Sequence, residues 1–316
     1  MTSVEPSPVD RRRVPTPSRL ARVRDVVASY VSLMKLRVVE LLLITTLPAM
    51  VLAERGLPSL GLVAATLVAG TLAGGSAHAF NQVLERDIDA VMHRTRRRPV
   101  ARSVVGPYPA FAFASVLLAA SVAIMLAWVN ALAAALTIAA NLFYVLVYTM
   151  LLKRRTSQNI VWGGVAGCVP TLIGWAAVTG TLDWPPVLLF LVVFFWTPPH
   201  YWPLAMRYRD DYARAGIPML PVVASSRTVA LQILLYSWAM VATTLVLWPV
   251  ADLGWIFGLA AVLTGAWFLI EAHRLYGRAR RAGDGAGLTA MRLFHGSITY
   301  LTVVFVAVMA DILVLG

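Results

Sequence analysis

The chain has 316 residues, of which 59 % are hydrophobic and 13 % charged, and its mean hydropathy is +0.74. These values lie outside the range of soluble globular domains and predict a polytopic membrane protein. The formal net charge of +12 is compatible with nucleic acid, an acidic substrate or a membrane surface as partner. The positions of the charged residues along the chain distinguish between these three kinds of partner.

Residues 1–30 are rich in Pro, Ser and Arg and contain no apolar run. This composition predicts a disordered, basic tail rather than a cleavable signal peptide. A mitochondrial presequence is the alternative, and Glu5, Asp10 and four prolines disfavour it.

Nine windows in the rest of the chain are apolar and long enough to cross a hydrocarbon core of roughly 30 Å. They lie near residues 36–53, 59–80, 108–128, 130–151, 159–178, 185–205, 228–249, 254–275 and 293–315. The expected fold class is therefore all-α, with nine transmembrane helices in a single domain over residues 31–316.

The cations follow the predicted topology. When alternate connections between the windows are taken together, 26 of the 27 Lys and Arg lie on one side of the membrane. The positive-inside rule then places the N-terminus in the cytoplasm and, after nine spans, the C-terminus outside. Because topology accounts for the basicity, no nucleic-acid partner is expected.

The segment NQVLERDIDAVMHRTRRRP, Asn81–Pro99, follows an apolar window and holds three of the fifteen acidic residues. On a continuing helix, Asn81, Glu85 and Asp89 recur every four residues and share one face. An amide oxygen and two carboxylates form a ligand set that suits Mg²⁺, which binds through one or two carboxylates plus substrate phosphate. Asp87 points to the opposite face, where it is expected to pair with arginine.

The alternative for this segment is a solvated loop whose acids only balance neighbouring cations. Five arginines nevertheless strengthen the metal hypothesis, because a diphosphate needs guanidinium donors as well as metal. These arginines are Arg86, Arg94, Arg96, Arg97 and Arg98.

A second acidic segment, WTPPHYWPLAMRYRDDYARAGIPMLPV, follows the sixth window and includes Asp210 and Asp211. It again places carboxylates beside arginines at the cytoplasmic end of an apolar helix. The two segments are therefore expected to form two walls of one site. The alternative is a basic loop that anchors to anionic lipid.

Two histidines and the single cysteine lie in or beside the windows. His200 and His78 are either functional or hydrogen-bonded to neighbouring helices. Cys168 has no second cysteine to pair with and is expected to be a small buried apolar side chain.

Five motifs in order resemble the protoheme IX farnesyltransferase (heme O synthase) family within the UbiA superfamily of intramembrane prenyltransferases. The likeness spans about residues 30–312. The motifs are N-x3-E-x-D-x-D-x3-H-R-T within Asn81–Pro99, KRRTSQNIVWGGVAG (Lys153–Gly167), WTPPHYW (Trp196–Trp202), DYARAGIPMLPV (Asp211–Val222) and LFHGSITYL (Leu293–Leu301).

The resemblance implies a helix bundle around a central cavity that is capped by the cytoplasmic loops. It implies transfer of the farnesyl group of farnesyl diphosphate to a vinyl group of heme B, with addition of water, to give heme O. It also implies Mg²⁺ as cofactor, a bacterial plasma membrane location with contact to membrane lipid, and a downstream heme A synthase as a partner.

The resemblance assigns roles to particular residues as well. Asn81, Glu85 and Asp89 are the first catalytic, Mg²⁺-binding wall, and Asp211, with Asp210 beside it, is the second. His200 is the histidine expected near the porphyrin. The diphosphate-binding cations are Arg94, Lys153, Arg154 and Arg209.

Two other functions stay open at this point. A related enzyme would use the same chemistry on a quinone precursor or chlorophyllide. A heme or lipid transporter is disfavoured because both acidic segments lie on one side, whereas transporter sites usually lie near the bilayer midplane.

Overall fold

The computed structural model describes residues 19–282 and 289–316, and these ranges contain helices and no strand. Helices α4, α9 and α10 are short, and the π-helix η1 directly continues α6. The elements are α1 (Arg19–Met34), α2 (Leu36–Glu54), α3 (Leu60–Leu84), α4 (Arg86–Val91), α5 (Pro107–Trp128), α6 (Ala131–Leu142), η1 (Phe143–Leu152), α7 (Asn159–Thr179), α8 (Trp184–Arg207), α9 (Arg209–Arg214), α10 (Leu220–Val223), α11 (Ser226–Val250), α12 (Trp255–Ala282) and α13 (Ala290–Leu315).

Eight helical segments in the described ranges are long and apolar enough to cross a membrane. They agree with the last eight predicted windows to within a few residues, except that several continue beyond the window at the end that carries the basic residues. The predicted count of nine is not confirmed. The first window corresponds to α2, in which Ile44–Glu54 is the apolar part found in the described residues.

Local sequence signals set several helix ends. The side chains of Ser59, Asn130 and Ser225 each accept a hydrogen bond from a backbone N–H in the first turn of α3, α6 and α11. Helix α7 ends at Gly180, whose φ of 69° is readily adopted by glycine.

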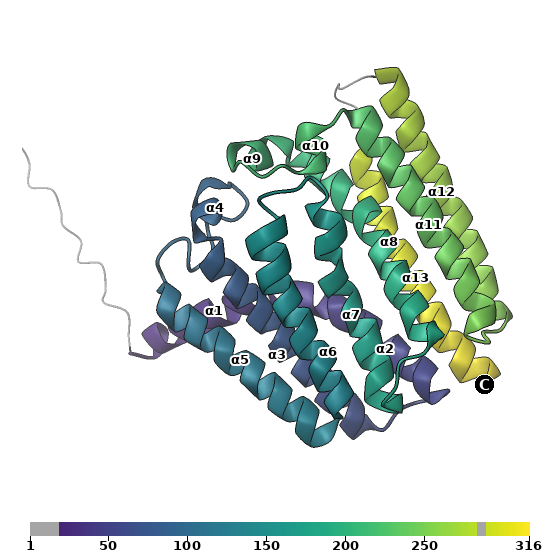
Figure 1. The fold of residues 1–316 in the computed structure, drawn as a ribbon, viewed down its shortest axis with the longest axis horizontal. Coiled ribbons are helices and arrows are strands. Elements are labelled where there is room, and N and C mark those ends of the chain that lie inside the picture. Colours follow the sequence, from purple (N-terminus) through teal and green to yellow (C-terminus); the bar gives the residue numbers. More distant parts are fainter. Residues whose placement is uncertain (1–18, 283–288) are drawn as a thin grey trace, which may run out of the picture.

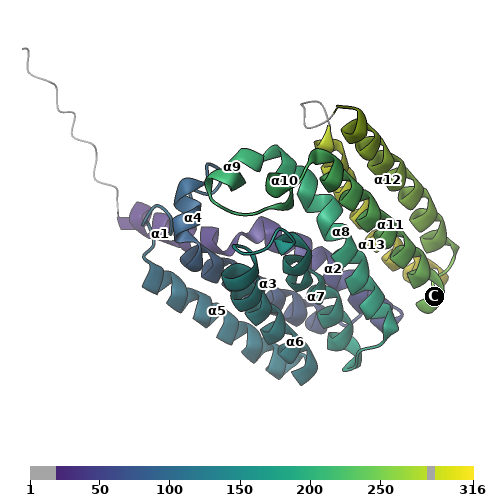
Figure 2. The ribbon, with the colours of Figure 1, turned by 45° about the horizontal axis from the view of Figure 1, so that its top comes forward.

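The spanning helices pack in sequence-neighbour pairs and across the bundle. Helix α3 lies against α5, α2 against α7, and α7 against α8. Helices α11 and α13 pack beside α8, and α12 packs against α11 and α13 (Figures 1 and 2). Helices in lipid associate through close packing and not through loss of water contact. Gly174 illustrates this, because a Cβ there would lie 2.5 Å from the backbone oxygen of Thr46 in α2.

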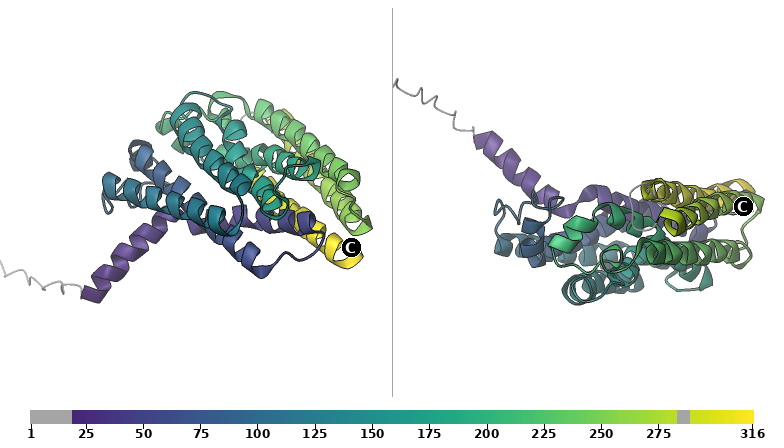
Figure 3. Two further views of the ribbon diagram at one scale, coloured as in Figure 1. Left: turned by 60° about the horizontal axis from the view of Figure 1, so that its bottom comes forward. Right: turned by 90° about the horizontal axis from the view of Figure 1, so that it is seen from above.

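Helix α1 differs from the sequence-based expectation. Residues 1–18 of the predicted tail lie outside the described residues, whereas residues 19–30 are helical. Figure 3 shows α1 extending away from the bundle. Its sequence RLARVRDVVASYVSLM lacks the proline that marks the preceding residues, so helix formation is not opposed there.

The short helices form a cap at one end of the bundle. Helices α4, α9 and α10 lie together there, whereas the C-terminus lies toward the other end (Figure 1). Both acidic segments belong to this cap, and hydrogen bonds join the turn after α4 to α9. The sequence prediction that the two segments meet is thus confirmed by the structure.

Candidate active site

The first acidic segment keeps helical spacing across a break. Helix α3 ends at Leu84, and Glu85 has φ −106° and ψ 16° before α4 begins. The N–H of Glu85 still donates to the oxygen of Asn81 at 2.9 Å, and the N–H of Asp89 to the oxygen of Glu85 at 2.8 Å. Asn81, Glu85 and Asp89 therefore lie on consecutive turns, and each is at most 2 % exposed.

Both buried carboxylates have a cation as partner. Lys153 Nζ lies 2.5 Å from Glu85 Oε2, and Arg98 Nη1 lies 2.7 and 2.6 Å from the two oxygens of Asp89. Such pairing offsets the high cost of burying a charge. Glu85 Oε1, however, has no hydrogen-bond partner in the described part of the chain.

The π-helix η1 brings Lys153 to this position. Thr149 Oγ1 donates to the oxygen of Tyr144 five residues earlier, at 2.9 Å, and receives a hydrogen bond from Asn81 Nδ2 at 3.3 Å. Lys153 follows directly after η1. Wide turns of this kind often occur at functional sites.

A cavity of about 460 Å³ lies next to these residues, between α2, α3, α6, η1, α7, α8 and α13. Its upper part, next to the cap, is polar and cationic. Its lower part, away from the cap, is lined mainly by small, aliphatic and aromatic side chains. The charged and larger polar side chains of the lining are Lys35, His78, Asn81, Arg94, Arg98, Asn141, Tyr144, Tyr148, Lys153, His200 and Tyr201.

Lys35 is a cavity residue that the sequence analysis did not select. It stands between α1 and α2 with φ 49°, a conformation uncommon outside glycine. Enclosure by protein, followed by the positive charges of Arg98 and Lys153, holds the pKa of Lys35 well below its usual value. A bound anion would relieve this repulsion. The sequence signal was its place in the short basic run Lys35-Leu36-Arg37 at the start of the first window.

Asp211 connects the second acidic segment to the first. Its carboxylate oxygens accept hydrogen bonds from the backbone N–H groups of His93 at 3.2 Å and Arg94 at 3.3 Å, and it pairs with Arg214. Burial raises the pKa of the carboxyl, but these three donors outweigh burial and leave the pKa below its ordinary value. The expected second wall is thus a clamp on the loop that carries Arg94.

Arg94 itself lines the cavity. Its Nη2 donates to the hydroxyl of Tyr212 at 3.3 Å, and that hydroxyl lies 2.9 Å from the hydroxyl of Tyr201. Arg94 and Lys153, two of the cations expected to bind diphosphate, thus both line the cavity.

Other predicted residues lie on the outside of the cap. Asp210 and Arg209 are exposed and do not line the cavity. Arg154 donates to both oxygens of Asp87 at 2.9 Å, which agrees with the outward direction expected for Asp87.

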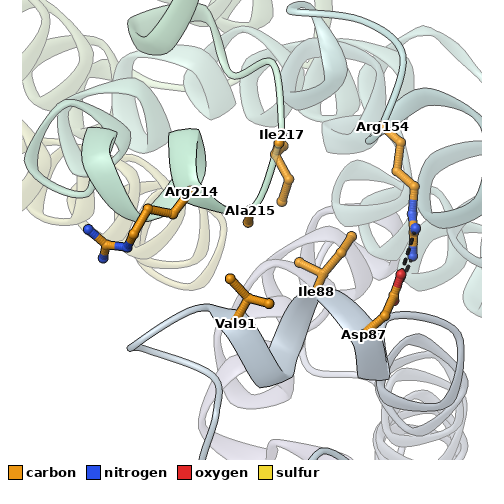
Figure 4. A pocket seen from close by; sticks show the side chains of 8 residues that line it. Asp87, Ile88, Val91, Arg154, Arg214, Ala215 and Ile217 are labelled. Carbon is orange, nitrogen blue, oxygen red and sulfur yellow. Dashed lines mark hydrogen bonds and ion pairs between the residues drawn. The ribbon is translucent and has the colours of Figure 1, made fainter.

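A second hollow, of about 340 Å³, lies where α4 faces the turn after α9. Figure 4 shows Ile88, Val91 and Ile217 around it, the Asp87–Arg154 pair at its edge, and Arg214 pointing away. The carboxylate of Asp87 in this hollow is already paired with Arg154. The larger cavity combines an extensive apolar lining with several converging polar and cationic groups, and it is therefore the better candidate site.

The residues present fit a magnesium ion. Residues 19–282 and 289–316 contain no group of three His, Cys, Asp or Glu that could hold a metal ion. Mg²⁺ needs only one or two carboxylates when a phosphate supplies the remaining oxygens. Glu85 offers an unpartnered buried oxygen for this purpose, with Asp89 and Asn81 on the neighbouring turns.

Known proteins share both the sequence and the fold. Residues 42–309 match the UbiA prenyltransferase family. A protein from Nocardioides sp. named protoheme IX farnesyltransferase is 58 % identical over 296 residues, which cover 94 % of each chain. Among solved structures, a digeranylgeranylglyceryl phosphate synthase has a TM-score of 0.75 at 14 % identity, covering 90 % of this chain and 98 % of that one. A UbiA homologue from Archaeoglobus fulgidus bound to GPP and Mg²⁺ has a TM-score of 0.61 at 16 % identity, covering 89 % and 99 %.

Proposed function

Since the chain belongs to the UbiA prenyltransferase family, we propose that it transfers the farnesyl group of farnesyl diphosphate to a vinyl group of heme B, with addition of water, to give heme O. The name of the Nocardioides relative supports the choice of substrates. The observation that carries the proposal is the position of the buried pairs Glu85–Lys153 and Asp89–Arg98 above a largely apolar cavity.

The cap residues are suited to release of a diphosphate. Asn81, Glu85 and Asp89 would hold Mg²⁺. A bound Mg²⁺ would neutralise part of the negative charge on the diphosphate leaving group. Arg94 and Lys153 donate hydrogen bonds to the diphosphate oxygens, so that negative charge is stabilised as the allylic C–O bond breaks. Asp211 keeps Arg94 in place through the backbone of its loop.

The lower cavity is suited to the remaining steps. Its aliphatic and aromatic lining accommodates the isoprenoid chain and excludes water from the farnesyl cation. The aromatic faces of Tyr144 and Tyr148 stabilise a nearby cation. The vinyl group attacks the farnesyl carbon, the positive charge moves to the carbon beside the porphyrin ring, and water adds there with loss of a proton.

The proposal also includes the location and orientation of the protein in the membrane. We place the chain in the bacterial plasma membrane, with a cytoplasmic N-terminus and the C-terminus outside, because alternate connections carry the cations. Both substrates then enter from membrane lipid, and the cap faces the cytoplasm. A downstream heme A synthase is the expected recipient of the product.

The test uses purified protein with farnesyl diphosphate, heme B and Mg²⁺, and mass spectrometry of the porphyrin fraction. The expected product has gained one farnesyl group and one hydroxyl group, because the added water loses a proton. Parallel reactions contain a quinone precursor or chlorophyllide in place of heme. Prenylation of one of these compounds, with heme unchanged, would identify a different acceptor. Transport of heme without formation of any product would show that the protein is not a prenyltransferase.

A further inference from the structure

One side of the cavity holds a histidine whose ring is fixed from both faces. His200 of α8 is stacked between Trp196, at 4.1 Å between ring centroids and 14° between planes, and Phe294 of α13, at 4.6 Å and 25°. Trp196 is itself held by a 2.7 Å hydrogen bond from its Nε1 to the backbone oxygen of Ser297. The imidazole therefore has little freedom to tilt.

The hydrogen bonds of Ser297 define which nitrogen of His200 carries the proton. Ser297 Oγ lies 2.6 Å from the backbone oxygen of Phe294, and a carbonyl oxygen can only accept. The single hydroxyl hydrogen of Ser297 is thus used there. His200 Nδ1, 2.8 Å from the same Oγ, must then be the donor, which leaves Nε2 as a free lone pair in the neutral ring.

His200 differs in this respect from the other histidines. His78 also lines the cavity, but its Nδ1 is buried without a partner. His273 pairs with Trp238, and His93 and His295 are exposed. Only for His200, within residues 19–282 and 289–316, does a fixed oxygen accept the ring proton beside the cavity.

A neutral imidazole with one nitrogen donating to a fixed oxygen and the other free is the arrangement found in metal-ligating histidines. We propose that His200 Nε2 binds the iron of the heme acceptor as an axial ligand, and that Ser297 acts as the positioning residue for this bond. The inference rests on the proposed function, because it takes heme as the substrate. It adds that the site recognises the metal as well as the porphyrin ring.

The coordination bond would orient the acceptor. An axial ligand on one face sets the height and plane of the porphyrin against α8 and α13. The vinyl groups are then held at a fixed position relative to the cationic cap, which favours reaction over release. A metal-free porphyrin of the same shape would lack this anchor.

The test is a titration of purified wild-type protein with ferric heme B, followed by absorption and electron paramagnetic resonance spectroscopy. We expect a histidine-ligated spectrum in the wild type. His200→Ala should lose that spectrum and bind heme more weakly than any other variant, and added imidazole should restore the spectrum. Ser297→Ala should keep histidine ligation but weaken heme binding about 10- to 100-fold, since the ring is no longer held.

The controls separate this inference from the proposed function. His295→Ala, at an exposed position on α13 near Ser297, should leave the heme spectrum unchanged. Binding of farnesyl diphosphate to His200→Ala shows that this variant is folded. If His200→Ala keeps the wild-type spectrum, or if His78→Ala loses it instead, the axial role of His200 is refuted while heme remains the substrate. If wild-type protein binds no heme but prenylates another acceptor, the proposed function itself fails.

Discussion

Lys153 Nζ lies 2.5 Å from Glu85 Oε2, although 68 residues separate the two in the chain. The pair joins the end of η1 to the break between α3 and α4 and is almost fully buried on the carboxylate side. Removal of one partner from such a pair leaves a buried charge without compensation. The pair therefore contributes both to the shape of the cap and to its charge.

The first prediction concerns the buried carboxylates. Glu85→Gln and Asp89→Asn should each lower the rate of farnesyl transfer by about 100-fold or more, because they remove charge at the diphosphate site. The amount of folded protein in the membrane, measured in parallel, separates this loss of rate from any destabilisation caused by the unpaired Lys153 or Arg98. Initial rates with purified enzyme measure the effect.

The matched control for both variants is Asp87→Asn. Asp87 lies in the same segment, but its side chain is 60 % exposed and pairs with Arg154 on the outside of the cap. It should retain nearly full activity. Full activity of Glu85→Gln, or equal loss in Asp87→Asn, would contradict the assigned Mg²⁺ wall.

The second prediction concerns Lys35. Its repulsion by Arg98 and Lys153 is relieved when a diphosphate binds, so Lys35→Gln should raise the KM for farnesyl diphosphate about tenfold. The affinity for heme should stay the same. Arg155→Gln, an exposed cation after η1, serves as control, and an unchanged KM in Lys35→Gln would show that the lysine does not contact substrate.

The third prediction separates two neighbouring aspartates. Asp211→Asn should speed hydrogen exchange at the backbone of His93 and Arg94, because their acceptor is weakened. Asp210→Asn, at the exposed neighbour, should not. If Asp211 instead binds metal, its variant would need more Mg²⁺ for half-maximal rate while exchange in the loop stays slow.

Asp211 also gives the clamp a pH dependence. Its pKa in the folded protein is lowered, so the unfolded chain takes up the proton first as the pH falls. The stabilisation is complete above the ordinary carboxyl pKa of about 4 and is lost as the pH falls below it. Exchange at His93 in the wild type, corrected for its intrinsic pH dependence, should therefore accelerate only in that acidic range.

The fourth prediction concerns the contact between α7 and η1. A Cβ on Gly163 would lie 2.3 Å from the ring of Tyr148, so Gly163→Ala should displace this ring in the cavity and lower turnover about tenfold or more. Gly61→Ala, where nothing lies within 4 Å of the added atom, is the matched control. Equal rates for the two variants would show that the position of Tyr148 is unimportant.

The sequence was sufficient for features that depend on local pattern. Eight spans follow from apolar length alone, and the outward direction of Asp87 follows from helical spacing. Glu85 and Asp89 were found because acid is rare in this chain. These signals require no knowledge of which distant residues meet.

Features that depend on tertiary contact could not be obtained in this way. The sequence predicts Asp211 as a metal ligand, but it gives no sign that the same carboxylate accepts hydrogen bonds from N–H groups of a loop more than a hundred residues away. Lys35 lies far in sequence from both acidic segments, and only the packed cavity shows that it lies near Arg98 and Lys153. The tautomer of His200 depends on a serine in another helix.

The widened turns of η1 have a consequence for the register of the whole segment. An α-helix rotates by about 100° per residue, and a π-helix accommodates extra residues over the same rise. Deleting one residue between Phe143 and Leu152 would rewind this segment and swing Lys153 to another side of the helix. The buried carboxylate of Glu85 would then lose Lys153 as its counter-ion, so a deletion within η1 would disturb the charge of the cap without changing any residue of the cap itself.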